Sequence, residues 1–375
     1  MRIALVHDFL TRFGGAERVL LELAEMFPEA PIYTFLYDEW KMGRWFKKER
    51  VQTSFLQKFP SFFLKRPQLL WPFYGAAAES FDLRDFDLVI SSSSIFSKGV
   101  ITRPQTVHIC YTHSVSRFAW DYSFEYLKEN NLGFFSRFLA KTYLSYFRLY
   151  DRAAALRPDY FIANSRSTAS RLKKYYGVDA KVIYPPVSLI ADRESPIVKE
   201  KKEREEYFLI VSQLAPYKKI DVAVEAFNKL ELPLLVIGEG AQKEYLEKIA
   251  RPNVKILGWK SDEEIAEYMK NCVAFVFPGE DDFGIAPVEA MSLGKPVLAL
   301  ARGGALETVL PGITGELFQE PTPEVLADGV RRLRRNLVNF SPLVISKWAG
   351  RFSRERFRQE IVEFIEKTGY NQDKE

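Results

Sequence analysis

Short apolar runs alternate with amphipathic stretches along this chain, and the alternation occurs twice. A short apolar run bounded by turn residues is typical of a strand buried on both faces, whereas apolar residues three and four apart are typical of a helix. Repeated alternation of the two patterns predicts an α/β fold with parallel sheets. We therefore expect two Rossmann-like doubly wound domains.

The predicted strands and helices fall into two sets. Strands of the first half are predicted at residues 3–6, 88–91, 107–111 and 160–163. The second half repeats the pattern, with strands at 207–211, 234–237, 254–257, 274–277 and 296–299 and helices at 219–230, 263–271 and 287–293. Aromatic residues at helical spacing after Lys347 predict one or two closing helices.

A charged stretch at residues 190–206 separates the two sets and lacks clear helical or strand periodicity, so we interpret it as a linker. The chain has 375 residues, which is long for a single hydrophobic core. We predict an N-terminal domain over residues 1–190 and a C-terminal domain over residues 191–354. In open α/β sheets ligands bind beyond the carboxyl ends of the strands, so a cleft between two such sheets suits a donor on one side and an acceptor on the other.

Composition excludes several classes of function. A formal net charge of +4 is too small to predict binding to nucleic acid. The two cysteines, Cys110 and Cys272, lie in apolar runs, which predicts neither a disulfide framework nor a zinc site. The apolar N-terminus is too short for a signal sequence or a membrane-spanning helix, so we expect a cytoplasmic protein.

The most informative segment runs from Pro278 to Gly294 and reads PGEDDFGIAPVEAMSLG. It follows a predicted strand and begins a helix, with Pro287 in the first turn and Glu289 near the helix N-terminus. A carboxylate can accept hydrogen bonds from two adjacent sugar hydroxyls, and the N–H groups of Gly284 and Ile285 offer donors to the same ligand. The alternatives are a solvated acidic turn for Asp281 and a carboxylate stabilised by the helix dipole for Glu289.

This segment resembles the signature of family 4 of the retaining glycosyltransferases, in which two acidic residues with seven residues between them precede a small-residue helix. Asp281 and Glu289 occupy those two positions. Other segments match in order and spacing: GGAER at 14–18, YTHS at 111–114 with Arg117, Trp120 and Asp121, NSR at 164–166, YPPV at 184–187 and SQLAPYKK at 212–219. Bacterial mannosyltransferases of O-antigen and exopolysaccharide assembly are the most similar members.

The resemblance implies a GT-B fold with a C-terminal helix, at about 355–375, that crosses back to the first domain. It also implies that Glu289 holds the donor ribose, Asp281 a hydroxyl of the transferred sugar and Lys218 the diphosphate. Two departures stand out: the family usually has Glu where this chain has Asp281, and Arg where it has Gln213. Gln213 cannot make a charge-assisted bond to phosphate, which leaves Lys218, with Lys219, as the main cation.

The remaining residues expected at the donor are Gly14, Gly15, Ser212, Gly258, Trp259, Phe283, Gly284 and Ile285. The glycine pair precedes an apolar helical pattern and would present free N–H groups to a phosphate or sugar, although a simple tight turn is the alternative. Gly258 and Trp259 would contact the nucleobase, with local packing of the Trp259 ring as the alternative. Arg117, Asp121 and Arg166 are expected on the acceptor side.

The chain contains three histidines. His113 follows a predicted strand and would bond to a donor-sugar hydroxyl, as its counterpart does in the family, although a lone histidine is more often structural. His7 is placed after the first strand, in a structural or acceptor-side role. His108 lies inside a strand and is expected to pack in the core.

Asp85 and Asp87 form a DxD pattern that resembles the metal motif of the other large glycosyltransferase fold. The pair precedes a predicted strand and so lies at its entrance, away from the ligand end, and we reject this interpretation. No other cluster has metal-ligand spacing. We expect no metal cofactor, with the diphosphate neutralised by Lys218, helix N-termini and the glycine loop.

From Trp40 to Tyr74 the chain interleaves aromatic and cationic residues, with Glu49 as the single acid. This composition suits a membrane surface with anionic lipid, and residues 134–150 have a similar character. A core insertion under a basic face is the alternative. The first interpretation predicts a protein bound peripherally to the inner face of the cytoplasmic membrane, with a lipid-linked glycan as acceptor.

Together these expectations describe transfer of a hexose, by resemblance mannose from GDP-mannose, to a hydroxyl of a lipid-linked or growing glycan. The resemblance implies retention of the anomeric configuration. Two alternatives stay open: a nucleotide-sugar epimerase on the same fold, and a catalytically weak subunit that binds donor and scaffolds a polysaccharide assembly complex.

Overall fold

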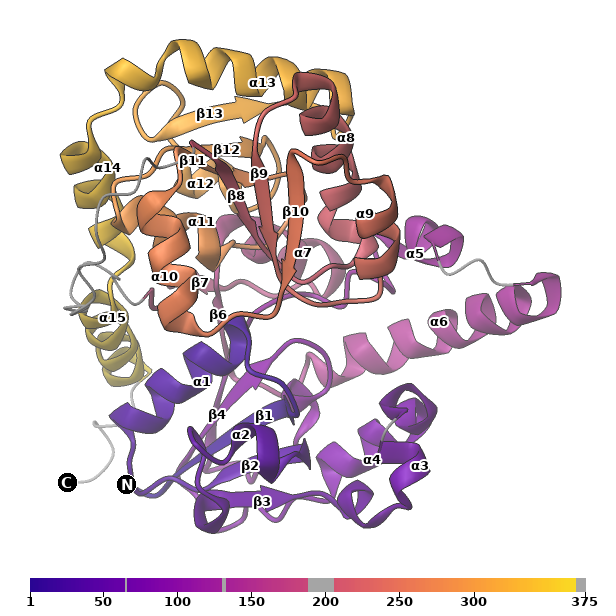
Figure 1. The fold of residues 1–375 in the computed structure, drawn as a ribbon. Coiled ribbons are helices and arrows are strands. Elements are labelled where there is room, and N and C mark those ends of the chain that lie inside the picture. The colour runs from indigo at the N-terminus through magenta and orange to yellow at the C-terminus, as the bar shows by residue number, and fades with distance from the viewer. Residues whose placement is uncertain (65, 130–132, 188–205, 369–375) are drawn as a thin grey trace. The chain divides into compact units, whose positions relative to one another are not determined.

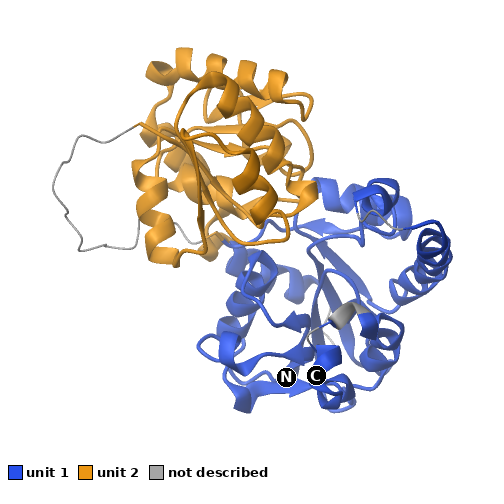
Figure 2. Ribbon diagram, turned by 45° about the vertical axis from the view of Figure 1, so that its right-hand side comes forward, with its two compact units in different colours: residues 1–186, 357–375 blue, residues 187–356 orange. Residues whose placement is uncertain are grey.

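The computed structural model describes residues 1–64, 66–129, 133–187 and 206–368. The chain forms two compact units, one of residues 1–186 and 357–375 and one of residues 187–356 (Figure 2). The linker predicted at 190–206 lies outside the described residues, apart from Glu206. The chain thus leaves unit 1 and returns to it through its C-terminal helix.

The described part of unit 1 contains a seven-stranded parallel sheet in the order β3-β2-β1-β4-β5-β6-β7 (Figure 1). Its strands are β1 (Ile3–Leu10), β2 (Ile32–Tyr37), β3 (Val51–Thr53), β4 (Leu88–Ser93), β5 (Val107–Thr112), β6 (Tyr160–Ala163) and β7 (Lys181–Val182). Its helices are α1 (Gly15–Met26), α2 (Glu39–Met42), α3 (Ser61–Leu64), α4 (Tyr74–Glu79), α5 (Ser123–Glu129), α6 (Phe134–Ala154), α7 (Arg166–Tyr175) and α15 (Arg354–Lys367), with 3-10 turns η1 (Lys48–Arg50), η2 (Phe55–Lys58), η3 (Pro67–Phe73) and η4 (Ser97–Gly99).

Alternate side chains of these strands point to opposite faces, and each face has its own core. On one face Leu5 and Ile90 pack with Leu20 of α1 and Phe357 of α15. On the other face Val6 packs in a cluster that includes buried residues of α4 and Leu144 and Phe147 of α6. The C-terminal helix is therefore part of the unit 1 core.

The described part of unit 2 contains a six-stranded parallel sheet in the order β10-β9-β8-β11-β12-β13. Its strands are β8 (Phe208–Val211), β9 (Leu234–Ile237), β10 (Val254–Gly258), β11 (Ala274–Phe277), β12 (Val297–Leu300) and β13 (Gly315–Phe318). Its helices are α8 (Ile220–Leu230), α9 (Lys243–Ile249), α10 (Asp262–Asn271), α11 (Ile285–Ser292), α12 (Ala305–Thr308), α13 (Pro323–Arg335) and α14 (Pro342–Ala349), with 3-10 turns η6 (Pro216–Lys218), η7 (Leu337–Asn339) and η8 (Gly350–Phe352).

Both sheets have the doubly wound order, which confirms the predicted fold class of two Rossmann-like domains. The strand order reverses between β1 and β4 in unit 1 and between β8 and β11 in unit 2. At such a switch point the loops leave the sheet in opposite directions and open a crevice. The loops after β1, β4, β8 and β11 are therefore where a ligand site is expected.

Two placements differ from the sequence prediction. His7 lies inside β1, not after it, because the strand continues to Leu10. Glu289 is the fifth residue of α11, beyond the first turn, because the left-handed Gly284 (φ +85°) starts the helix at Ile285 instead of at Pro287. Pro287 is still tolerated, since the third helical N–H has no partner within the helix.

Candidate functional site

The switch point of unit 2 brings together Lys218, from the loop after β8, and Asp281, from the loop after β11. The Lys218 Nζ lies 2.5 Å from both Asp281 carboxylate oxygens. The side chains are only 13% and 23% exposed, so the pair is largely shielded from water. The Tyr217 ring lies beneath the ammonium, with its centroid 5.1 Å from Nζ.

The electrostatics keep Lys218 charged. Burial favours the neutral amine and lowers the pKa of Lys218, but the negative charge of Asp281 and its hydrogen bond, together with Tyr217, outweigh burial. The net pKa of Lys218 is above the ordinary lysine value. Lys218 therefore stays protonated at neutral pH, paired with Asp281, and its ammonium suits an anionic ligand.

Three glycines fix the backbone around this ion pair. A Cβ on Gly279 would lie 2.7 Å from the Cα and carbonyl oxygen of Lys218, so only glycine lets the two loops touch. After β12, Gly303 has φ +59° and packs against the Asp281 carbonyl, while the Gly304 N–H donates to that carbonyl at 2.9 Å. The Asp281 loop is thus clamped from both neighbouring strands.

Helix α11 begins directly after this loop, at the N-cap Gly284. Its first-turn N–H groups, including that of Ile285, have no partner within the helix and can serve a ligand. Glu289 is partly exposed, one turn further along. Phe283 is buried and its ring contacts Phe352 at 5.4 Å between centroids, so Phe283 packs in the core and leaves the polar groups around it for binding.

The loops after β9 and β10 form the other side of this sheet edge. Trp259 is 68% exposed, so most of its side chain faces solvent. The backbone N–H of Trp259 donates to Glu239 Oε1 at 3.1 Å, and Gly258 (φ +70°) precedes it. Gly238 allows the β9 loop to contact the Ser212 carbonyl, where a Cβ would lie 1.8 Å away.

The other predicted donor residues of unit 2 lie on the loop after β8. Ser212 pairs through its N–H with Ile237, and Gln213 is exposed at the same edge. Lys219 has the left-handed φ of +52° and occupies the N-cap of α8. The structure thus brings the unit 2 residues predicted from sequence to one edge of one sheet.

The switch point of unit 1 contains a hydrogen-bonded row of His7, Ser92 and His113. The Ser92 Oγ lies 3.0 Å from His7 Nδ1 and 2.7 Å from His113 Nε2. His7 Nε2 in turn lies 3.4 Å from Glu17 Oε1, in the first turn of α1. The row crosses the carboxyl ends of β1, β4 and β5.

The partners fix the protonation of this row. His7 Nδ1 also faces the Ser92 carbonyl at 3.1 Å, which only accepts, so Nδ1 carries a hydrogen. The Ser92 hydroxyl then donates to His113 Nε2, which places the hydrogen of neutral His113 on Nδ1. Burial, with the nearby His7, lowers the pKa of His113 to about 3, so His113 stays neutral.

Asp8 holds the loop that follows Ser92. Its two carboxylate oxygens accept hydrogen bonds from the N–H groups of four successive residues, 94 to 97, at 2.6–2.9 Å. Asp8 is buried, so these bonds replace its solvation and fix the loop. Gly14, the N-cap of α1, has an extended backbone with φ −149°, and Gly15 is the first residue of that helix.

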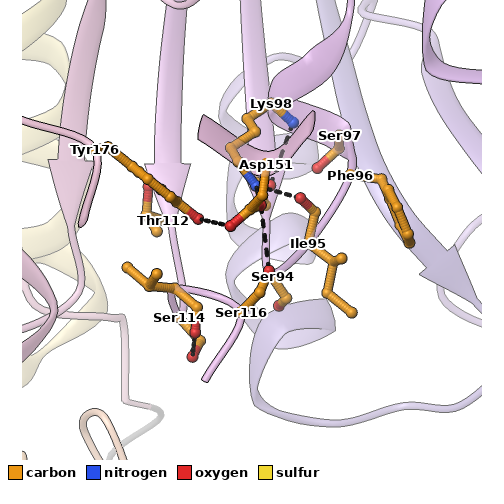
Figure 3. Close-up of polar contacts among 12 residues, drawn as sticks. Ser94, Ile95, Phe96, Ser97, Lys98, Thr112, Ser114, Ser116, Asp151 and Tyr176 are labelled. Atoms are coloured by element: carbon orange, nitrogen blue, oxygen red, sulfur yellow. Dashed lines mark hydrogen bonds and ion pairs between the residues drawn. The ribbon is translucent and has the colours of Figure 1, made fainter. Parts of the chain in front are cut away.

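A second buried network lies where α6 meets this loop (Figure 3). Asp151 of α6 accepts from Lys98 Nζ at 2.6 Å, Trp120 Nε1 at 2.8 Å and the Tyr176 hydroxyl at 2.7 Å. Lys98 also donates to the Ile95 carbonyl. The network ties α6 to the segment that follows His113.

Of the predicted acceptor-side residues, Arg117 and Asp121 form an ion pair and Arg166 lies on helix α7. Asp121 pairs with Arg117 at 3.6 Å and with Arg171 of α7 at 2.9 Å. Arg166 is the exposed first residue of α7, behind the N-cap Ser165. Asp121 thus links Arg117 to α7 through Arg171. Arg171 was not among the residues predicted from the motifs.

The DxD pattern lies away from the candidate site. Asp87 immediately precedes β4 and accepts from the Arg2 N–H at 2.8 Å, which places the DxD pattern at the strand entrance as predicted. Within the described ranges, no group of three or more His, Cys, Asp or Glu side chains is arranged to hold a metal ion. In the same residues, no helix is both long and apolar enough to cross a membrane.

Sequence reasoning missed several of these residues. Ser92 belongs to the serine run 91–94, where composition gives no reason to choose one member. Asp8 and Glu17 differ from ordinary surface acids only through their partners. Gly303 and Gly304 did carry a usable signal, because a glycine pair in the loop after a predicted strand is the same pattern as Gly14 and Gly15.

Two family models match this chain. Glycosyltransferase Family 4 matches residues 13–190, and Glycosyl transferases group 1 matches residues 192–337. The chain therefore belongs to the glycosyltransferases with the GT-B fold, and the family resemblance of the motifs is confirmed. Its N-terminal unit carries the family 4 module, and its C-terminal unit carries the group 1 module.

Individual relatives are more distant. An uncharacterized glycosyltransferase of Methanocaldococcus jannaschii is 31% identical over 133 residues, 34% of this chain and 38% of that protein. The alpha-1,3/1,6-mannosyltransferase of Saccharomyces cerevisiae is 26% identical over 300 residues, 63% of this chain and 59% of that protein. The matches thus span less than two thirds of either relative. A crystal structure of Anabaena HepE in complex with UDP has a TM-score of 0.69 at 18% identity and covers 98% of this chain and 100% of its own.

Proposed function

We propose that this protein transfers a hexosyl group from a nucleoside diphosphate sugar to a hydroxyl of a glycan. The observation that carries the proposal is the Lys218–Asp281 pair at the unit 2 switch point, beside the start of α11. A shielded cation, a helix N-terminus and carboxylates at one sheet edge are what a diphosphate joined to two sugars needs. The two glycosyltransferase modules support this assignment.

Each residue has a proposed role. Lys218 binds the diphosphate, with Lys219 as the neighbouring cation, because the Lys218 ammonium is kept charged at the switch point. Glu289 accepts from the ribose hydroxyls and Asp281 from a hydroxyl of the transferred sugar. Asp281 bonds to Lys218 with both oxygens, and each oxygen keeps a second lone pair that can accept from the sugar hydroxyl. His113, neutral and with its hydrogen on Nδ1, donates to a sugar hydroxyl.

Catalysis would rest on stabilising the departing diphosphate, since positioned cations and helix N–H groups stabilise charge that develops in the transition state. We propose retention of configuration and a reaction without a bound metal, both by family likeness. Lys218 and the first turn of α11 are the groups proposed to neutralise the leaving group.

The proposed donor is GDP-mannose and the proposed acceptor a lipid-linked or growing glycan. The mannose assignment is supported by the likeness to the mannosyltransferase of Saccharomyces cerevisiae. It agrees with the resemblance of the motifs to bacterial polysaccharide mannosyltransferases. We place the reaction at the cytoplasmic face of the membrane, where such an acceptor is found.

The test is a transfer assay with purified protein. GDP-mannose, UDP-glucose and UDP-galactose are each incubated with polyprenyl-linked glycan acceptors, and released nucleoside diphosphate and extended glycan are measured together. The proposal predicts equal amounts of GDP and of an α-linked mannosyl product. Donor binding without release of nucleotide would favour a scaffold subunit, and altered nucleotide sugar without glycan extension would favour an epimerase.

A further inference from the structure

Helix α6 presents an apolar surface that the described residues of unit 1 leave exposed. Figure 1 shows α6 as a long magenta helix whose N-terminal end lies well away from the sheet of unit 1. Six of its large apolar side chains are between 51 and 93% exposed: Phe134, Phe135, Phe138, Leu139, Tyr146 and Leu149. Contiguous exposed apolar side chains of this size mark an interaction site.

The helix has three distinct faces. Successive residues of an α-helix are about 100° apart, so Phe135, Leu139, Tyr146 and Leu149 share one stripe, with Phe138 beside it. Arg137, Lys141, Arg148 and Arg152 form a second stripe along one side of the first. The third face, formed by Leu144, Phe147, Asp151 and Ala154, is buried against the rest of unit 1.

Charge identifies the occupant of the outer faces. Between Phe134 and Tyr150 the helix contains no acid, and Asp151 is fully buried on the inner face. A second protein surface would need matching acids and pockets, whereas an anionic bilayer provides negative headgroups beside an apolar layer. Aromatic and leucine side chains next to a row of Arg and Lys fit that boundary.

The inner end of the helix is rigidly held. Asp151 accepts hydrogen bonds from Lys98, Trp120 and Tyr176, three partners from separate parts of unit 1. The Arg148 Nε also donates to the Ala119 carbonyl at 2.6 Å. A surface that binds the outer end of α6 is therefore held in a fixed position relative to the segment after His113.

We propose that the outer faces of α6 form the surface by which this protein docks on anionic lipid, with the side chains of Phe135, Phe138 and Leu139 entering the headgroup boundary. The other aromatic-rich segment, from Trp40 to Tyr74, is divided by the structure. Trp40 and Phe62 are exposed, whereas Phe46, Leu56 and Tyr74 are buried core residues. That segment therefore serves the core in part, and α6 is the stronger lipid surface. The inference extends the acceptor side of the proposed function, but its test needs neither donor nor acceptor.

The test measures flotation of the full chain with vesicles of phosphatidylcholine alone or with about one third phosphatidylglycerol. We expect binding to the anionic vesicles that weakens as salt is raised. A first variant should reduce the constant for binding to anionic vesicles at least about tenfold; it combines Phe134→Gln, Phe135→Gln, Phe138→Gln and Leu139→Gln. A second variant, Arg137→Gln with Lys141→Gln, should remove most of the salt dependence of vesicle binding. A matched control, Val338→Gln with Leu343→Gln, changes two exposed apolar residues of unit 2 and should have no effect.

A second measurement reports insertion directly. The two native cysteines are buried, so Phe138→Cys can be labelled with an environment-sensitive dye. Its emission should shift to the blue on anionic vesicles, whereas the same dye at Val338→Cys should not respond. The inference is overturned if the folded α6 variant floats as well as the wild type, if Trp40→Gln with Phe62→Gln abolishes flotation instead, or if the α6 variant only dissociates a dimer.

Discussion

At the scale of single residues, the donor side depends on how a lysine is kept charged in a shielded place. Asp281 supplies the negative charge that holds the pKa of Lys218 above its usual value against the effect of burial. The shorter Asp in place of the family's usual Glu still reaches Lys218 with both oxygens at 2.5 Å. Lys218 is therefore held, charged and largely shielded from water, at the position where we propose that a diphosphate binds.

The stability of this pair can be measured by a double-mutant cycle of Lys218→Met and Asp281→Asn. Removing one partner leaves the other charge poorly solvated, so we expect a coupling energy on the order of 1–3 kcal/mol in denaturant unfolding. The exposed pair of Lys229 and Glu324 is the control and should couple by less than about 1 kcal/mol. Equal coupling energies in both cycles would mean that the Lys218–Asp281 pair is as exposed to solvent as the surface pair.

The buried histidines predict how stability depends on pH. Burial lowers the pKa of His108 and of His113 to about 3, whereas in the unfolded chain both titrate near 6.5. Below that pH the unfolded chain binds more protons, so the free energy of unfolding falls as pH falls. The loss should reach about 1.4 kcal/mol per pH unit for each histidine.

Urea unfolding at pH 7 and pH 5, followed by tryptophan fluorescence, tests this dependence. Four of the six tryptophans, at positions 40, 45, 71 and 120, report on unit 1. His108→Gln should reduce the slope by about one proton. A slope that stays the same would show that His108 is protonated in the folded state.

At the scale of elements, apolar runs predict strands where both faces of the strand are buried. The runs at 160–163, 234–237 and 274–277 coincide with β6, β9 and β11, because apolar residues, aliphatic and aromatic, fill nearly all of their positions. The run at residues 32–37 is fully buried as well, but Thr34 and two tyrosines interrupt its apolar pattern, and β2 was not predicted. Strand β7 has two residues and depends on pairing with β6, a contact that no local pattern can reveal.

The loop contacts that form the donor edge are also set by elements packing together, as Gly279 shows. In Gly279→Ala the new Cβ would meet the Lys218 backbone at 2.7 Å, so the two loops must separate. We expect a loss of about 1–3 kcal/mol in unfolding free energy and weaker donor binding.

Gly350→Ala is the matched substitution, because nothing lies within 4 Å of its added Cβ and its φ is −55°. It should leave both stability and donor binding near the wild-type values. If calorimetry finds the two variants equivalent, the close approach of the loops does not exist in solution.

At the scale of the whole molecule, the chain returns to unit 1 through α15. Phe357, Ile361 and Ile365 lie in the same core as Leu5 and Leu20, about 350 residues away in sequence. The helix itself was expected from aromatic spacing, but Phe352 and Phe357 belong to different units. The spacing of aromatic residues predicts a helix, but it does not predict which of the two hydrophobic cores each aromatic side chain joins.

Phe357→Ala should remove a fully buried ring and destabilise unit 1 by about 3–5 kcal/mol. Val362→Ala, on the exposed side of the same helix, should cost less than about 1 kcal/mol. The two variants are compared by limited proteolysis and urea unfolding. Equal stability would place α15 outside the unit 1 core.

Part of the candidate site could be predicted from the sequence, and part depends on contacts between distant segments. Lys218, Asp281 and Gly284 follow predicted strands, so the rule for carboxyl ends places them at one sheet edge. Ser92 and Asp8 act through hydrogen bonds to segments 20 to 90 residues away in sequence, which only the folded sheet brings close. The sequence thus predicts which loops meet, and packing determines which side chains within them bond.

The central claim is that unit 2 holds a nucleoside diphosphate sugar through Glu289 and Lys218. Calorimetric titration with GDP-mannose tests it most directly, with Glu247→Ala, an exposed carboxylate of α9, as control. We predict that Glu289→Ala raises the dissociation constant at least about a hundredfold, since two hydrogen bonds to a carboxylate are lost. Glu247→Ala should bind as the wild type does. An unchanged dissociation constant in folded Glu289→Ala would contradict the account.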